Sequence, residues 1–89
     1  MKFNITAGSH KALVDLELDG KGGFSGLISS SDFGTGKLGG SITGDHLTGA
    51  IELDGHAAKL SASISGETIS GTITAGWFFS QDFTGTIAA

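Results

Sequence analysis

A five-residue unit, apolar-x-Gly-x-Ile, occurs five times in these 89 residues and limits the possible fold more than any other feature. The copies are Phe24-Gly26-Ile28, Leu38-Gly40-Ile42, Leu47-Gly49-Ile51, Ile69-Gly71-Ile73 and Phe83-Gly85-Ile87. Because alternate residues of a strand share a face, each glycine points the same way as its two apolar neighbours. A glycine within a strand costs roughly 0.5–1 kcal/mol relative to alanine. Its repetition therefore favours a narrow barrel, where glycine permits strong bending and close approach of neighbouring strands.

Period-two alternation of apolar and polar residues extends over almost the whole chain, and sustained helical spacing is absent. The pattern predicts about eight short strands, near residues 2–7, 11–18, 23–30, 36–43, 46–53, 57–64, 68–74 and 82–88. Turn signals separate them at Ala7-Gly8-Ser9, Asp19-Gly20, Gly44-Asp45, Asp54-Gly55 and Gly66-Glu67. One apolar and one polar face on each strand is typical of an antiparallel sheet.

These patterns together predict an all-β fold, a small closed antiparallel up-and-down β-barrel that forms a single domain over residues 1–89. Closure removes the exposed edges of such a sheet. A barrel of about eight strands has an interior just wide enough for its own side chains. We expect Phe3, Phe24 and Phe83 to fill it with the isoleucines and leucines, and to leave no large ligand cavity. Function would then belong to the loops or the outer wall.

Residues 34–39, Gly34-Thr-Gly36-Lys-Leu-Gly39, match the G-x-G-x-x-G pattern of dinucleotide-binding loops. That loop needs a helix after it, because the helix N-terminus binds the pyrophosphate. Here the following residues alternate like a strand. We therefore interpret Gly34 and Gly36 as parts of a turn that enters a strand, and we predict no cofactor.

The composition excludes several classes of protein. The net charge is −4 and all five cations are lysines, whereas a nucleic-acid surface normally has a basic cluster with arginine. Without cysteine, neither a disulfide framework nor a zinc ribbon can form. The sequence has no run of about 18 apolar residues, so it predicts no transmembrane helix. The first residues lack the apolar region of a signal peptide. We expect a monomer.

The histidines do not predict a metal or catalytic centre. In an up-and-down barrel the loops alternate between the two ends, so His10 and His56 share one end and His46 lies at the other. Three ligands cannot converge in that arrangement, although two histidines with Asp32 or Asp82 could. No G-x-S-x-G motif is present, and the paired carboxylates lie on outward faces. The residues therefore predict a protein that is not an enzyme and that holds no metal.

Three consecutive aromatic residues, Trp77, Phe78 and Phe79, precede the last predicted strand. Alternation cannot place all three inside, and exposed aromatic residues are typical of binding surfaces. Alternatively, Trp77 and Phe79 plug the end of the barrel. The topology brings this segment to the same end as other aromatic, acidic and histidine residues. The predicted partner-binding end consists of His10, Asp32, Phe33, His56, Trp77, Phe78, Gln81 and Asp82.

Residues 31–88 resemble the small β-barrel domains of the transferrin-binding protein B family of bacterial surface lipoproteins. The resemblance rests on Asp32-Phe33-Gly34, the strands Leu38 to Ile42 and Ile69 to Ile73, Gly76-Trp77-Phe78-Phe79, and the closing strand Phe83 to Ile87. It implies an eight-stranded antiparallel barrel at a bacterial surface or outside the cell, which binds a host protein or haem protein through loops. Without the resemblance we expect a cytoplasmic protein.

The predicted function is thus a binding or structural module with a protein partner. Two alternatives stay open. The first is a carrier of small ligands that resembles the calycins, and the second is a small barrel cyclase or isomerase. A lined, empty interior would favour the carrier. A deep polar pocket with His10 or His56 beside an acid would favour the enzyme.

Overall fold

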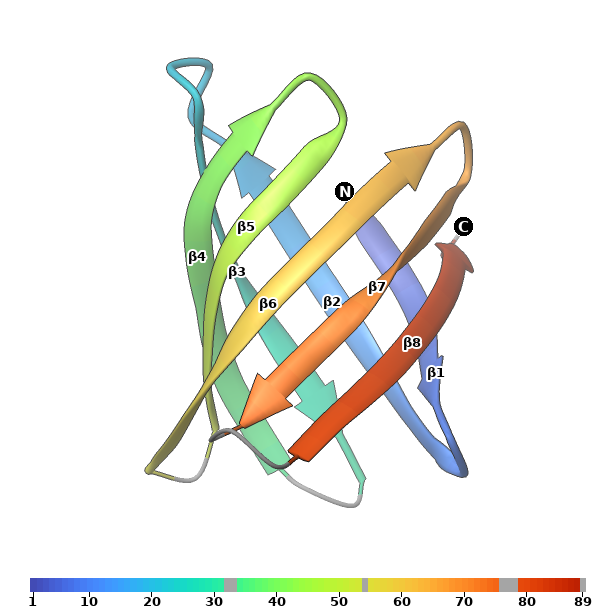
Figure 1. Ribbon diagram of the computed structural model, residues 1–89. Coiled ribbons are helices and arrows are strands. Elements are labelled where there is room, and N and C mark those ends of the chain that lie inside the picture. Colours follow the sequence, from blue (N-terminus) through green and yellow to red (C-terminus); the bar gives the residue numbers. More distant parts are fainter. Residues whose placement is uncertain (32–33, 54, 76–78, 89) are drawn as a thin grey trace.

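The structure is a computed structural model that describes residues 1–31, 34–53, 55–75 and 79–88. The strands are β1 (Lys2–Ala7), β2 (His10–Leu18), β3 (Gly23–Ser30), β4 (Gly34–Thr43), β5 (His46–Leu53), β6 (His56–Ser65), β7 (Thr68–Ala75) and β8 (Phe79–Ile87). Each pairs antiparallel with the next along the chain, and β8 pairs with β1 to close the barrel. The predicted closed up-and-down barrel is confirmed (Figure 1).

The connections alternate between the two ends of the barrel, as the sequence predicts. At one end lie the connections after β1, β3, β5 and β7, and we call this the loop end (bottom of Figure 1). The other three connections and both chain termini lie at the opposite end, which we call the termini end. Three two-residue turns begin with a glycine in the left-handed region, at Gly8, Gly44 and Gly66, with φ of 64°, 62° and 61°. This conformation suits the twist of a tight hairpin.

A longer connection at the termini end, residues 19–22, is held by one carboxylate. Asp19 Oδ1 accepts hydrogen bonds from the main-chain N–H groups of Lys21, at 2.7 Å, and Gly23, at 2.9 Å. These bonds lower the pKa of Asp19 below its ordinary value of 3.8, because they stabilise the ionised form. This side chain thus satisfies two N–H groups of the connection, and the Asp19 N–H in turn donates to the Gly23 carbonyl oxygen at 3.1 Å.

The barrel interior contains the apolar residues that the alternation assigns to it. Phe3, Phe24 and Phe83 are buried, as predicted, with at most 5% of their surface exposed. Leucine, isoleucine, valine and alanine side chains from β1 to β7 complete this core. Burial contributes about 1.5–3 kcal/mol for each large apolar side chain, so this lining is the main source of stability in a small domain.

The recurring glycines lie where two strands approach too closely for a side chain. At Gly71 a Cβ would overlap the Ser61 carbonyl oxygen on β6, and Ala62 Cα would lie 2.6 Å away. Gly40 and Gly49 are opposite each other on β4 and β5, and each excludes a Cβ in the same way. The interpretation that these glycines permit close strand packing is therefore confirmed.

The turn predicted at Gly34 and Gly36 is wrong for Gly36. Strand β4 begins at Gly34, and Gly36 pairs with Leu53 inside the β4–β5 ladder. A Cβ there would overlap the Glu52 carbonyl oxygen. Gly36 thus acts like the repeated glycines, although it stands outside the apolar-x-Gly-x-Ile unit. Two glycines in three residues, Gly34-Thr35-Gly36, are typical of a turn, so the sequence pattern did not indicate that Gly36 lies in a strand.

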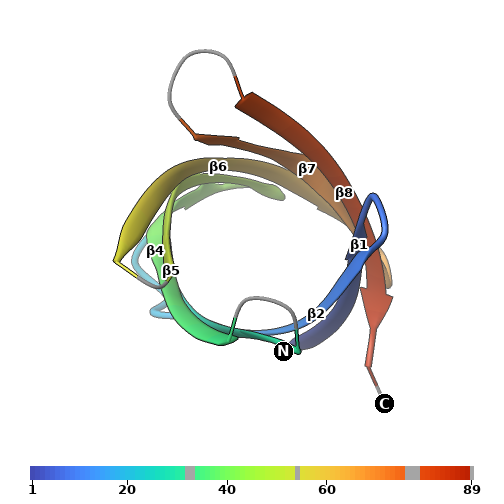
Figure 2. The same ribbon diagram turned by 90° about the horizontal axis from the view of Figure 1, so that it is seen from below.

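Closure of the barrel rests on the shortest of its eight ladders. Residues Phe3–Thr6 of β1 pair with Thr84–Ile87 of β8, which gives four residue pairs. The β7–β8 ladder covers eight pairs and continues to Phe79. β1 and β8 lie side by side near the termini end and diverge toward the loop end (Figure 1). Viewed from the loop end, the first half of β8 stands outside the ring of the other strands (Figure 2).

In the part of the chain that the structure describes, no helix has the length and apolarity needed to span a bilayer.

Candidate functional site

Half of the predicted partner-binding residues lie within the described structure. His10 begins β2 and His56 begins β6, and both are exposed at the rim of the loop end. Gln81, half-buried, and Asp82, exposed, lie on β8 near the same end. Asp32, Phe33, Trp77 and Phe78 lie outside the described residues, as does the proposed plug by Trp77 and Phe79 side chains.

The barrel interior offers little room for a ligand. The described side chains enclose a void of about 20 Å³, lined by apolar residues from Ile5 to Phe83. A space of this size holds about one water molecule, and an apolar lining provides no partners for it. Small-molecule sites normally measure about 300–1,000 Å³, so the expected filled interior agrees with these contacts.

The described histidines and carboxylates do not gather in one place. Among residues 1–31, 34–53, 55–75 and 79–88, no group of three or more His, Asp or Glu side chains is arranged to hold a metal ion. His46 lies at the termini end, away from the rim that carries His10 and His56, as the alternating loops predict.

One serine–histidine pair lies on the outer wall. His46 Nδ1 and Ser63 Oγ are 3.0 Å apart on the paired strands β5 and β6; His46 is exposed and Ser63 is half-buried. A serine nucleophile needs a base, a group that orients the base, and a site that binds the substrate. Neither residue lines the hollows described in this section, so the contact is an exposed cross-strand pair.

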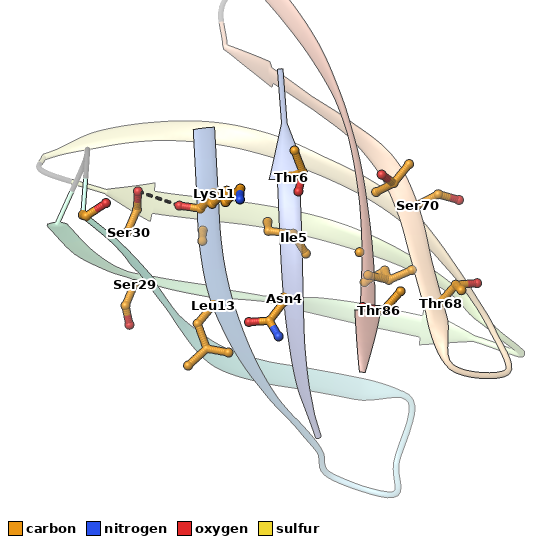
Figure 3. A pocket seen from close by; sticks show the side chains of 15 residues that line it. Asn4, Ile5, Thr6, Lys11, Leu13, Ser29, Ser30, Thr68, Ser70 and Thr86 are labelled. Carbon is orange, nitrogen blue, oxygen red and sulfur yellow. Dashed lines mark hydrogen bonds between the residues drawn. The ribbon is translucent and has the colours of Figure 1, made fainter. Parts of the chain in front are cut away.

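A broad, open hollow of about 830 Å³ lies on the outer wall across β3, β2, β1, β8 and β7. Its side chains form two rows in register. One row runs through Ser29, Leu13, Asn4, Thr86 and Thr68. The other row includes Lys11, Thr6, Thr84 and Ser70 (Figure 3).

Hydroxyl groups dominate this hollow, and Lys11 is the ionisable side chain in its described lining. Ser30 Oγ donates a hydrogen bond to the Lys11 carbonyl oxygen at 3.1 Å (Figure 3). A hydroxyl becomes a nucleophile only beside a base, and the described lining holds neither histidine nor carboxylate. The hollow is therefore an open, polar stretch of the outer wall.

A different kind of surface lies where β8 departs from β1. In an antiparallel strand, the N–H and C=O of one residue point to the same side, and successive residues alternate. The Ala88 N–H donates to the carbonyl oxygen of Lys2, the first residue of β1, at 2.9 Å. The Ile87 N–H points to the other side of β8 and donates to the Glu67 carbonyl oxygen, just before β7, at 2.8 Å. Even-numbered residues of β8 thus present their main-chain groups toward β1.

Ser80 and Asp82 therefore aim main-chain groups toward β1 at positions beyond the β1–β8 ladder. We call the main-chain groups of Ser80 and Asp82 the open edge of β8. Gln81 Nε2 donates to the Asp82 carbonyl oxygen at 3.0 Å. The same Gln81 amide lies beside the β1–β2 turn, with Nε2 3.7 Å from the position that a Cβ of Gly8 would take. The Gln81 side chain thus covers part of the open edge.

Sequence reasoning missed the open edge, although a signal for it was present. The predicted strand at residues 2–7 is the shortest of the N-terminal strands, and the observed β1 has six residues against nine in β8. A strand of six residues cannot pair along the whole of a neighbour that is three residues longer. The prediction that closure removes exposed edges is correct for the termini end only.

Comparisons with protein-family models, curated proteins and solved structures find no match for this chain.

Proposed function

We propose that this barrel is a non-enzymatic module that binds another protein through its loop end. The observation that carries the proposal is the contrast between a filled interior and an exposed polar rim. The enclosed void of about 20 Å³ has no room for a small ligand, whereas His10, His56 and Asp82 are exposed around the loop end. These side chains supply hydrogen-bond and charged groups at the end opposite both termini (Figure 1).

The same contrast weighs against the two alternative functions. A carrier related to the calycins needs an interior cavity, and the core of Phe3, Phe24 and Phe83 occupies that space. A barrel cyclase needs a deep polar pocket, and the apolar lining of the void supplies no catalytic group. On the sequence resemblance to transferrin-binding protein B, we further propose a partner of the host-protein or haem-protein class at a bacterial surface.

The test is capture of proteins on the immobilised chain, from serum and from a bacterial lysate. The loop-end variant combines His10→Ala, His56→Ala and Asp82→Ala, and the matched control combines His46→Ala, Asp45→Ala and Glu67→Ala at the termini end. We expect the loop-end variant to lose at least about tenfold in affinity for a captured protein, as for central contact residues. The control should bind within about twofold of the parent.

Two results would contradict the proposal. In one, the termini-end control loses binding and the loop-end variant keeps it. In the other, neither serum nor lysate yields a protein retained by the parent chain. Serum-specific retention would in addition favour the host-protein class over a cytoplasmic partner.

A further inference from the structure

We propose that the open edge of β8 is the contact point for the partner, and that an extended segment of the partner pairs with it as an additional β-strand. This inference rests on the proposed function and names the mode of binding. Strand addition to an exposed sheet edge is a general recognition mode, in which main-chain hydrogen bonds provide affinity. The open edge supplies the required groups at Ser80 and Asp82, beyond the β1–β8 ladder.

The other described strands offer shorter stretches of edge at the loop end. Five residues of β8, Phe79–Phe83, lie beyond the β1–β8 ladder, whereas His10–Ala12 of β2 and His56–Ala58 of β6 extend three residues beyond the β2–β3 and β6–β7 ladders. β8 diverges from β1 toward the loop end (Figures 1 and 2), so the open edge lies at that end of the barrel. The entering strand would take the place of the Gln81 amide on the Asp82 carbonyl oxygen.

Gln81 has the properties of a replaceable cover. Its side chain bonds a main-chain carbonyl of the next residue, a local contact that an incoming N–H group can reproduce. Exposed edges tend to cause aggregation, and proteins commonly protect them with polar or charged side chains. Gln81 and the exposed Asp82 protect the edge in this way while the partner is absent.

The charge of Asp82 identifies the partner's chemistry. Its carboxylate lies on the outer face of β8, where Oδ1 accepts a hydrogen bond from Thr72 Oγ1 at 2.9 Å. A basic residue directly opposite on the added strand would be favourable, and an acidic one unfavourable. A second copy of this chain is the poorer occupant, because edge-to-edge pairing would bring two Asp82 carboxylates together. The expected occupant is therefore a heterologous segment with a lysine or arginine among alternating β-branched residues.

The first test is hydrogen exchange of main-chain amides in the free protein. Thr84 and Thr86 lie in the β1–β8 ladder and face β1, so their amides should exchange slowly. Ser80 and Asp82 face the same side beyond the ladder, so their amides should exchange at least about tenfold faster. An Asp82 amide as protected as that of Thr84 would mean that the edge is not open.

The second test uses acetylated eight-residue peptides of alternating valine and threonine, titrated into the isotope-labelled full chain and followed by NMR. One peptide has a central lysine, one has glutamate in its place, and one is the lysine peptide N-methylated on alternate residues. The lysine peptide should shift the Ser80 and Asp82 amides and slow the exchange of Asp82. The glutamate peptide should bind about two- to fivefold more weakly, and N-methylation should reduce affinity at least about tenfold.

Two protein variants separate main-chain pairing from charge. Asp82→Pro removes the Asp82 N–H group from the open edge, together with the charge, and should abolish binding, whereas Asp82→Asn keeps that N–H group and should lose only the preference for lysine. Equal binding of the N-methylated peptide, or shifts confined to another surface, would overturn strand addition. Asp82 shifts that depend on protein concentration without peptide would instead identify a second copy as the occupant. If no peptide binds and the loop-end variant still loses captured protein, strand addition fails while the proposed function stands.

Discussion

The two halves of β8 are consecutive in sequence and form one strand, yet they lie in different environments. In the half near the termini end, Thr84 and Thr86 pair with β1, and the barrel is sealed. In the half near the loop end, Ser80 and Asp82 face the same way with no place in that ladder. The difference teaches that a barrel can be closed by topology and still present a short stretch of strand edge.

Both halves keep their contact with β7. The β7–β8 ladder runs without a break from Thr68 and Thr86 to Ala75 and Phe79. The whole end of the β7–β8 hairpin is therefore displaced from β1, and β8 does not separate from β7 there. This explains why Ile73, on the same part of β7, is only partly buried.

The largest expected loss of stability comes from a substitution on β7, the strand that pairs with both halves of β8. Gly71→Val places a branched side chain against Ser61 and Ala62, where even a Cβ overlaps the neighbouring strand. Overpacking typically costs about 1–3 kcal/mol and occasionally more, a large part of the stability of a small domain. We expect an unfolded or strongly destabilised chain in thermal melts followed by circular dichroism.

The control for Gly71→Val is Ser70→Val on the adjacent, exposed outward position of β7. It should stay within about 0.5 kcal/mol of the parent, as most surface substitutions do. A Gly71→Val protein that melts with the parent would contradict the close-packing role of the repeated glycines.

Proline substitutions in the two halves of β8 test directly whether only one half is paired with β1. Thr84→Pro removes a main-chain donor from the closing ladder and should cost about 1–3 kcal/mol. Asp82→Pro removes the equivalent donor from the open edge, where proline is tolerated, and should cost less than about 1 kcal/mol. For a chain of this size, each 1 kcal/mol corresponds to about 4–8 °C in Tm. Equal losses for the two variants would show that the closing ladder extends to Asp82.

The smallest effect concerns a turn at the sealed end, which serves as a reference. The folded pKa of Asp19 is lowered by two main-chain hydrogen bonds. Its stabilising contribution is therefore present above the ordinary value of 3.8 and is lost as the pH falls through the lower, folded pKa. The protection of the Lys21 and Gly23 amides, relative to their intrinsic exchange rates, should fall in that acid range, while that of the Thr84 amide is unaffected. An NMR titration in which Asp19 ionises at its ordinary pKa would refute this account.

Much of the fold could be predicted from residues whose roles are local. The alternation around Phe3, Leu60 and Ile69 assigns the buried face of their strands, because side chains in a strand alternate whatever the partner. Glycines such as Gly44 mark two-residue turns that fix the pairing of the strands on either side. Seven of the eight ladders follow from such short connections.

The candidate site could be predicted only in outline. Placing His10, His56 and Asp82 toward one end required only the count of alternating loops, which the topology confirms. The open edge required the register of β8 against β1, two strands from opposite ends of the sequence with no turn between them. That register depends on the tilt and stagger with which the whole barrel closes.

The sequence by itself thus determined eight strands, their buried faces and the glycines that let them pack closely, because these depend on neighbours along the chain. The tertiary structure alone decided that β1, with six residues, seals only part of β8. The physical reason is that the closing ladder is non-local: its length follows from strand stagger around the ring, which no adjacent turn constrains. The main-chain groups of Ser80 and Asp82 are left at the loop end as a consequence.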